Sequence, residues 1–392
     1  MTGTFDIATA RQRFPALKEA QVYLDNAGGS QVLGDVIDSI TEYYTKNNVQ
    51  LGASYRVSQA STSKYGEGYK AAARYINAST DEIVLGASTT QLFVNLAGAL
   101  KFNEGDEIII SKLDHETNID PWLLMADRLK LKVKWWVSEK PELKLTPENL
   151  KPLLSPKVKF VACTHVSNIL GTIHDVKAIA NVVHEAGALF CVDGVSFAPH
   201  RQVDVKAFGV DFYAFSWYKV YAPHLAILYA STSAQEYIKP YAHYFNPTKT
   251  LEDKIGLAGS NYECSQSLPV VVSYLDGAFD AIGEHEEKLQ KILLDFLNSR
   301  NDVIIYGSTS SDSTVRVPTI SFTVDGTNSR KIVEEAEKIS NFGFRWGHFY
   351  SKRLCDEVLG LGPEGVTRVS MVHYNTEEEI HSLVELLKKI LP

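Results

Sequence analysis

Residues 189–219 read LFCVDGVSFAPHRQVDVKAFGVDFYAFSWYK, and this stretch decides the fold class. Two of its runs, LFCV and FYAF, are apolar along their whole length, which is typical of strands whose two faces are both buried. Polar residues follow each run directly: Asp193 after the first, and Ser216 with Lys219 after the second. In an open parallel sheet, ligands bind where loops leave the carboxyl ends of the strands. Both positions are therefore candidates for a functional site.

The same pattern extends in both directions along the chain. From about Asp81 to the AILYA run at 226–230, short apolar runs alternate with longer helical patterns. This alternation predicts an α/β fold with a mostly parallel sheet between two layers of helices. After a long helical pattern at 268–299, the runs IIYGS, TISFTVDG and TRVSMVHY indicate a smaller α+β domain, whose last helix begins with a capping box, Thr376 with Glu379. We expect an N-terminal arm at 1–20, a large domain at 21–265 and a small domain at 266–392, with the early helices returning to the small domain.

The bulk composition excludes several classes of protein. With 45% hydrophobic and 22% charged residues, the 392-residue chain has the composition of a globular protein. A formal net charge of −8 and the lack of a Lys/Arg-rich run argue against nucleic acid as a partner. No stretch has the length and apolar character of a bilayer span, and the N-terminus has no secretory pattern, so we expect a cytoplasmic protein. The four cysteines have no metal-ligand spacing, so no metal site is expected.

Three further strand ends carry polar side chains. Ser88, Thr89 and Thr90 lie between a strand and a helix, where backbone N–H groups at the helix N-terminus attract a phosphate. Serine and threonine are also routine N-caps, so this signal is weak on its own. The next strand end places His115 at the same edge of the sheet, and the one after it places Asn168 there. A single histidine in such a place is more often structural.

The pair Asp193 and Lys219 gives the site a specific chemistry. A carboxylate at the end of a buried strand needs a cationic partner, and a protonated pyridine nitrogen is such a partner. A lysine flanked by Trp217, Tyr218 and Val220 is poorly solvated, which lowers its pKa and favours imine formation. Together they predict a site for pyridoxal 5'-phosphate (PLP), with Lys219 as the Schiff-base lysine. An exposed surface lysine is the alternative for Lys219 taken alone.

Three motifs in a fixed order carry a family resemblance: THVSNILGT at 164–172, VDGVSFAPHRQVDVK at 192–206 and DFYAFSWYKVYAPH at 211–224. With them, the chain from about Val22 to Glu378 resembles the fold-type I PLP enzymes of the class V aminotransferase family, in particular its cysteine-desulfurase-like branch. The resemblance implies a PLP-dependent enzyme with a large and a small domain. It also implies a homodimer with shared active sites.

The resemblance assigns roles to individual residues. Lys219 would form the Schiff base, Asp193 would pair with the pyridine nitrogen and His115 would stack on the ring. The other cofactor contacts are assigned to the phosphate (Ser88, Thr89, Thr90, Ser216, Tyr218), to the ring oxygen (Ser196 or Asn168) and, across a dimer interface, to Ser260. Substrate contacts are assigned to Arg368, which would bind the substrate carboxylate, and to Asn26, His348 and Tyr350. The family usually has histidine where Tyr218 stands and often glutamine where Ser196 stands.

One loop departs from the desulfurases of the family. Those enzymes carry a nucleophilic cysteine in a run of the form Arg-x-Gly-His-x-Cys, whereas residues 345–350 read RWGHFY. Tyr350 stands in the place of the cysteine, and a phenol is a poor sulfur acceptor. Cys355 follows five residues later, and we expect it to lie in a helix beyond the loop.

The central segment resembles fungal members of the family, such as the decarboxylative aldolase of ustiloxin biosynthesis, with which it shares FSWYK at 215–219 and a later HYF run at 243–245. The first hypothesis is therefore a lyase that cleaves a Cβ substituent, a carboxylate or a sulfur group, from a small L-amino acid through an enamine or ketimine, with or without bond formation to an aldehyde. The alternatives are a cysteine desulfurase or C–S lyase, an aminotransferase, and a PLP-binding protein without turnover. Loops near 50–55 and 346–350 are expected to set substrate choice.

Overall fold

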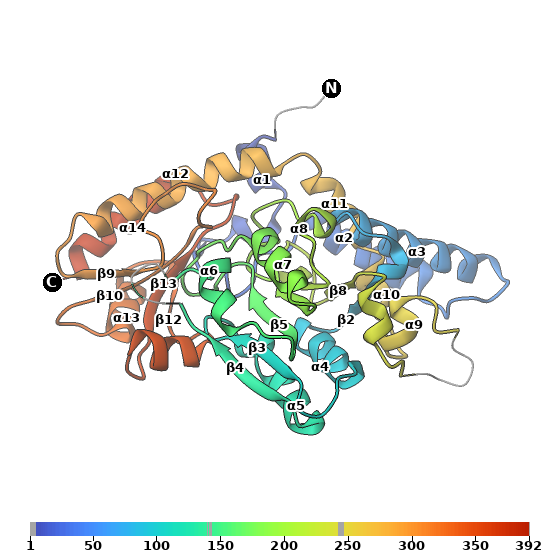
Figure 1. Cartoon of the computed structure of the whole chain (residues 1–392). Coiled ribbons are helices and arrows are strands. Elements are labelled where there is room, and N and C mark those ends of the chain that lie inside the picture. The colour runs from blue at the N-terminus through green and yellow to red at the C-terminus, as the bar shows by residue number, and fades with distance from the viewer. Residues whose placement is uncertain (1–4, 139, 141–142, 242–246, 392) are drawn as a thin grey trace.

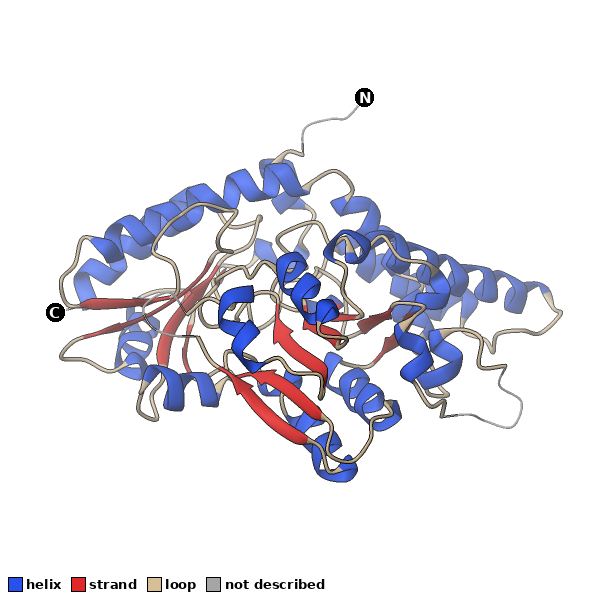
Figure 2. Cartoon of the chain, in the orientation of Figure 1, coloured by secondary structure: helices blue, strands red, loops and turns tan. Residues whose placement is uncertain are grey.

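The computed structural model describes residues 5–138, 140, 143–241 and 247–391 of the 392-residue chain. The HYF run at 243–245 lies outside the described residues. A large sheet lies in the middle of the molecule, and a smaller sheet lies beside it, covered by the long helix α12 (Phe279–Asn298) (Figure 1 and Figure 2).

Seven strands form the large sheet, and they include the two runs that decide the fold class. Their order across the sheet is β2 (Ile83–Gly86), β8 (Ala226–Ala230), β7 (Phe212–Ser216), β6 (Leu189–Asp193), β5 (Val158–Thr164), β3 (Glu107–Ser111) and β4 (Lys132–Trp136). β8 runs antiparallel to both of its neighbours, and all other neighbouring strands run parallel. The expected α/β fold with a mostly parallel sheet is confirmed.

Both faces of the large sheet are buried, which explains the continuous apolar runs. Along β6, Phe190 and Val192 belong to one apolar cluster and Cys191 to another, because successive side chains of a strand alternate between the two faces. On the face of Cys191 the sheet is covered by α4 (Thr89–Ala99) and α5 (Asp120–Leu129). The helices on the other face include α3 (Arg56–Tyr75), α7 (Val176–Glu185) and α11 (Leu268–Leu275).

Four antiparallel strands form the small sheet, in the order β12 (Arg345–Gly347), β13 (Val366–Ser370), β10 (Thr319–Val324) and β9 (Val303–Tyr306). α12, α13 (Ser329–Ile339) and α14 (Glu377–Ile390) bury apolar side chains in one cluster with this sheet. α14 begins with the expected capping box, in which the Thr376 hydroxyl accepts a hydrogen bond from the N–H of Glu379. The C-terminal part of the chain thus has the expected α+β character.

The N-terminal segment returns to the side of the small sheet. β1 (Val22–Tyr23) pairs in parallel with β11 (Phe342–Gly343), and Arg11 of α1 (Ile7–Gln12) forms an ion pair with Glu379 of α14. α11, although it follows residue 265, contributes to the apolar cluster of the large sheet. The chain therefore crosses between the two sheets more than once, and the domain boundaries after residues 20 and 265 remain a prediction.

The remaining elements are short or connect the two sheets. They are α2 (Gly34–Glu42), α6 (Pro147–Leu150), α8 (Val205–Phe208), α9 (Leu251–Ile255), α10 (Tyr262–Ser265), the 3-10 turns η1 (Pro15–Lys18), η3 (Thr80–Glu82), η4 (Glu116–Asn118), η5 (Lys151–Leu153), η6 (Trp217–Lys219) and η7 (Ala234–Tyr237), and the π-helical turns η2 (Tyr43–Asn47) and η8 (Leu354–Leu359). None of the helices in the described ranges has the length and apolar character needed to cross a membrane. Among the same residues, no group of three or more His, Cys, Asp or Glu side chains could hold a metal ion.

Candidate active site

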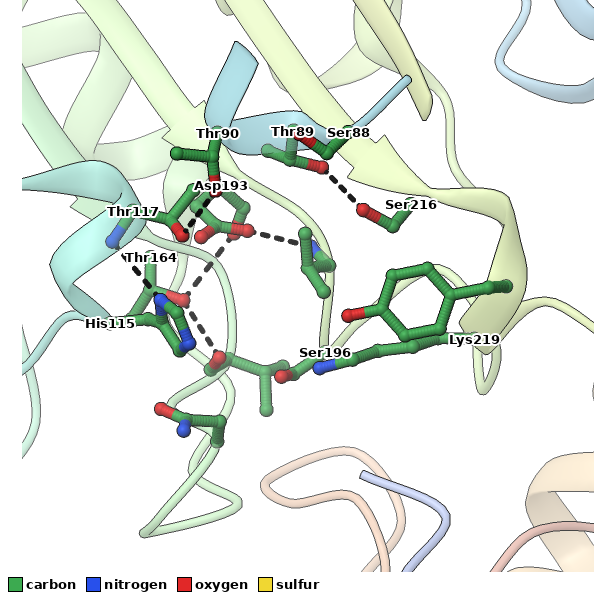
Figure 3. A pocket seen from close by; sticks show the side chains of 14 residues that line it. Ser88, Thr89, Thr90, His115, Thr117, Thr164, Asp193, Ser196, Ser216 and Lys219 are labelled. Carbon is green, nitrogen blue, oxygen red and sulfur yellow. Dashed lines mark hydrogen bonds between the residues drawn. The ribbon is translucent and has the colours of Figure 1, made fainter. Parts of the chain in front are cut away.

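A cavity of about 480 Å³ lies where β5, β6 and β7 end, at the carboxyl edge of the large sheet. His115, Asp193, Ser196, Ser216 and Lys219 face this space from different loops (Figure 3). Ten residues to which the sequence assigns a role line it: Ser88, Thr89, Thr90, His115, Asn168, Asp193, Ser196, Ser216, Tyr218 and Lys219. The other lining residues, which the sequence did not assign, are Thr117, Thr164, Val166 and Val195.

One end of the cavity has the character of an anion site. Helix α4 begins there, and the hydroxyl of its N-cap residue Ser88 accepts a hydrogen bond of 3.1 Å from the N–H of Gln91. The hydroxyls of Thr89 and Ser216 lie 2.7 Å apart, and both line the cavity (Figure 3). The N-terminus of an eleven-residue helix carries a partial positive charge and free N–H groups, so this end of the cavity suits a phosphate.

Tyr218 lines the cavity and contacts His224, a residue of the neighbouring cavity that the sequence reasoning missed. The ring of Tyr218 stacks on the imidazole of His224, with centroids 4.8 Å apart and planes at 15°. Burial raises the pKa of the Tyr218 phenol, so the hydroxyl keeps its proton and can donate a hydrogen bond. The signal for His224 is its place in the motif DFYAFSWYKVYAPH, five residues after Lys219, in a chain that lacks the usual histidine at 218.

Asp193 and Lys219 form the polar centre of the cavity. Both side chains are buried, and Val195 donates a backbone hydrogen bond of 2.8 Å to the Asp193 carboxylate. Burial raises the pKa of Asp193 to about 6. Burial, with the nearby charge of Arg368, lowers the pKa of Lys219 to about 8. A carboxylate that burial disfavours and an amine whose pKa is lowered are the two groups expected for an imine-forming cofactor with a cationic ring.

His115 presents a neutral ring to the cavity. Its Nδ1 accepts a hydrogen bond of 3.0 Å from the N–H of Thr117, so the proton of the neutral ring is on Nε2. Burial, with the charges of Lys219 and Arg368, lowers the pKa of His115 to about 3. The ring centroid of Tyr350 lies 5.3 Å from that of His115, with the planes at 39°. His115 is therefore an uncharged aromatic surface, suited to stacking rather than to proton transfer at neutral pH.

Arg368 lies beside the cavity and does not line it. Its guanidinium is buried and donates hydrogen bonds to the Asp25 carboxylate (2.7 Å) and to the backbone carbonyl of Asn168 (3.2 Å). The guanidinium carbon also lies 3.6 Å from the ring centroid of Phe349. The sequence reasoning missed Asp25, for which the only available signal was that a buried arginine needs a counter-ion. Arg345, opposite Arg368 in the small sheet, lies 3.2 Å from the other oxygen of Asp25.

The loop that follows β12 is fastened to loops of the large sheet. The side chain of Asn168 donates a hydrogen bond of 2.9 Å to the carbonyl of Phe349 and accepts one of 2.9 Å from the hydroxyl of Ser351. The carbonyl of Tyr350 accepts a hydrogen bond of 2.8 Å from the N–H of Glu116. Phe349 and Tyr350 have φ angles of +49° and +59°, in the left-handed region that bulky residues rarely adopt. This backbone leaves the Tyr350 side chain 75% exposed beside His115.

Besides Arg368 and Tyr350, three more residues with assigned roles do not line this cavity. The amide of Asn26 is engaged by the carbonyls of Tyr23 and Ser370, by Asn375 and by the Tyr374 hydroxyl. The ring of His348 turns towards the carbonyl of Gly362 and the carboxylate of Asp356. Ser260 lines a neighbouring cavity with Gly86, Ala87, Gln91 and His224, next to the start of α4.

Known proteins are similar to this chain in sequence and in fold. The model of the family described as aminotransferase class V matches residues 22–383. The chain belongs to the class V aminotransferase family. Among curated class V relatives, it is 53% identical to the aminotransferase-like protein FGM3 of Gibberella zeae, over the whole of both chains. It is also 37% identical to the cysteine desulfurase-like protein ustD of Aspergillus flavus, covering 100% of this chain and 92% of ustD. The apo structure of a cysteine desulfurase from Thermococcus onnurineus superposes with a TM-score of 0.91 at 26% identity, covering 100% of this chain and 99% of that one.

The cofactor of this class V enzyme is PLP, and the cavity fits it. The start of α4 with Thr89 and Ser216 suits the phosphate, and buried Asp193 suits a protonated ring nitrogen. The neutral face of His115 and the amine of Lys219 border the space between these two ends. Each part of the cofactor thus has a chemically matched side chain on the cavity wall.

The thiols of this class V enzyme lie away from the cavity. All four cysteines are buried, and none lines the cavity described above. Cys355 lies in η8, where burial raises the pKa of its thiol to about 12. A thiol with that pKa stays protonated at neutral pH and is a weak nucleophile.

Proposed function

We propose that this enzyme is a PLP-dependent lyase that cleaves a carboxylate or a sulfur group from Cβ of a small L-amino acid. The carbon left at Cβ then takes up a proton or adds to an aldehyde. The observation that carries the proposal is a cavity whose lining suits PLP and includes no cysteine, while Tyr350 lies beside His115.

Bound PLP supplies an electron sink for negative charge that develops on the substrate. The amine of Lys219 moves the proton at Cα, because its lowered pKa of about 8 lets it both accept and return a proton near neutral pH. The carboxylate of Asp193 holds a proton at the ring nitrogen. His115 covers the ring and, since it stays neutral, adds no competing charge. The guanidinium of Arg368 binds the substrate carboxylate.

A homodimer would complete the site. Ser260 does not line the PLP cavity of its own chain, although Gly86 and Ala87 beside it lead directly into the start of α4. Large apolar side chains near this region, Tyr44, Tyr55 and Leu257, are exposed in the single chain. An interface over this surface would bring Ser260 of the partner subunit towards the phosphate end of the cavity, and the oligomeric state in solution tests it.

The direct test is to incubate the PLP-loaded enzyme with aspartate, cysteine and cysteine sulfinate, with and without an aldehyde, and to analyse the products. We expect loss of the Cβ group from at least one of them. Lys219→Ala should abolish the reaction, while Lys239→Ala, at an exposed lysine, should not. No product from any substrate, or equal turnover by wild type and Lys219→Ala, would contradict the proposal.

An aminotransferase is the second candidate, and the name of the relative FGM3, an aminotransferase-like protein, favours it. It requires the same Lys219, Asp193 and Arg368. An amino donor alone would then convert the cofactor into a stable pyridoxamine form, which is visible in the absorbance spectrum. A lyase returns the cofactor to its original form after each turnover.

A further inference from the structure

The substrate-binding arginine of the proposed function is covered by an aromatic ring. The Phe349 side chain lies against the Arg368 guanidinium, with 3.6 Å between the guanidinium carbon and the ring centroid. Both side chains are buried, at 8% and 1% exposure. Asp25 and the carbonyl of Asn168 occupy two other directions around the guanidinium. A ligand carboxylate that approaches the guanidinium from the side of Phe349 therefore meets the ring before it meets the charge.

We propose that Phe349 is a displaceable cap on Arg368, and that the cap makes the site selective for ligands that carry a carboxylate. This inference rests on the proposed function, since it takes Arg368 as the carboxylate-binding residue. Phe349 belongs to the RWGHFY run, in which it directly precedes Tyr350, the residue in the place of the desulfurase cysteine.

The ring of Phe349 can move while the backbone of its loop stays in place. The Phe349 backbone is held by Asn168 through its carbonyl, and the next residue is held by the N–H of Glu116. These bonds do not involve the ring. Rotation of the side chain can therefore uncover the guanidinium while the loop stays in place.

A carboxylate gains more from the Arg368 guanidinium than a neutral ligand does when it displaces the ring. The Nε of Arg368 is buried and has no hydrogen-bond partner among the described residues. A carboxylate would exchange a cation–π contact for charge-assisted hydrogen bonds, which are stronger and satisfy this donor. A neutral amide can accept a hydrogen bond from this donor but brings no negative charge to the guanidinium, and an amine without a carboxylate offers no acceptor, so both gain less from displacing the ring.

Propionate tests the cap, because it carries a carboxylate but has no amino group to react with the cofactor. Its neutral isostere propionamide is the matched ligand, and both can be titrated into the PLP-loaded enzyme by calorimetry. Phe349→Asn removes the ring and keeps a residue that tolerates the left-handed region. We expect it to bind propionate about tenfold more tightly than wild type, with a smaller change for propionamide. Phe349→Leu, as a second variant, should shift propionate binding in the same direction.

Two controls make the result decisive. Phe296→Leu, at a half-buried phenylalanine of α12, should bind both ligands as wild type does. Arg368→Gln should lose the preference for propionate. Unchanged or weaker propionate binding in both Phe349 variants would overturn the cap, as would binding that does not depend on Arg368. The titration needs no turnover, so a failed cap is distinguishable from a failed lyase assignment, which the product assay with Lys219→Ala decides.

Discussion

The side chain of Asn168 holds the backbone of Phe349 through a hydrogen bond of 2.9 Å, although 181 positions separate the two residues in the sequence. The resemblance offered Asn168 as a contact to the cofactor ring oxygen. The side chain does reach the cavity wall, but its oxygen and one of its N–H groups are used to fasten the loop. Asn168 thus connects the edge of the cavity to the segment that covers Arg368.

Replacing Asn168 with alanine should loosen that loop. The carbonyl of Phe349 would lose its partner, and an unsatisfied buried polar group costs about 1–3 kcal/mol. We expect faster hydrogen exchange in a peptide covering residues 347–353, measured by mass spectrometry. Ser351→Ala removes only the second bond and should have a smaller effect. Equal exchange in wild type and Asn168→Ala would show that other contacts hold the loop.

Reconstitution of the apoenzyme with PLP should depend on pH through Lys219. Only the neutral amine attacks the cofactor aldehyde, and the pKa of Lys219 is lowered to about 8. The rate should therefore rise about tenfold for each pH unit between pH 6 and 8 and level off above 8. Below pH 6, protonation of Asp193, whose pKa is about 6, changes the charge beside the amine. His115 adds no second step near neutral pH, because its pKa is about 3. A midpoint near that of an ordinary lysine would mean that the amine is not desolvated.

Asp193→Asn should separate cofactor binding from catalysis. The amide has nearly the shape of the carboxylate, but it lacks the negative charge that stabilises a protonated pyridine nitrogen. We expect PLP to be retained in part and kcat to fall roughly a hundredfold or more. Absorbance of the bound cofactor and steady-state kinetics measure the two effects. Undiminished turnover would contradict the role assigned to Asp193.

Tyr350→Phe should leave catalysis nearly intact. Tyr350 is 75% exposed, and its hydroxyl makes no hydrogen bond within the described ranges, so its ring shapes the pocket beside His115. We expect kcat/KM within about twofold of wild type, as for other exposed substitutions. Tyr350→Ala, which removes the ring, should change kcat/KM more. A large loss in Tyr350→Phe would instead indicate acid or base work by the phenol.

Cys355→Ala should keep the activity and lose some stability. The thiol is buried in η8 with a pKa of about 12, which leaves it protonated at neutral pH. Removing a buried side chain should lower the free energy of unfolding by about 1 kcal/mol, with kcat/KM unchanged. Thermal melting and a product assay measure the two quantities. Loss of activity with an unchanged melting temperature would indicate that Cys355 acts as a nucleophile.

The residues that the sequence places well are those fixed by local structure. Asp193 and Ser216 end strands β6 and β7, Lys219 lies in the turn after β7, and Ser88 caps the helix that begins with Thr89 and Thr90. The sheet alone therefore brings them to one edge. The pairing of Asp25 with Arg368 could not be predicted from local structure. It depends on a contact between the segment after β1 and the end of β13, which lie far apart in the sequence. The same holds for Asn26 and His348, whose side chains are taken up by distant polar groups.

The conformation of Phe349 also could not be predicted from the sequence. Nothing in the letters RWGHFY predicts two consecutive bulky residues in the left-handed region, which glycine or asparagine would adopt more readily. Hydrogen bonds from Asn168 and Glu116 hold that backbone, and both come from loops of the large sheet.

The parallel pairing of β1 with β11 has a consequence for how the enzyme is made. A ribosome releases Val22 long before Phe342, and Asp25 precedes its partner Arg368 by 343 positions. Nascent domains generally fold from the N-terminus onwards. The growing chain can therefore assemble most of the large sheet before β11, the partner of β1, has been synthesised. Arg368, the arginine proposed to bind the substrate, is synthesised only near the end of translation. Because synthesis runs from the N-terminus, the cofactor cavity could form before Arg368 is available to bind a substrate.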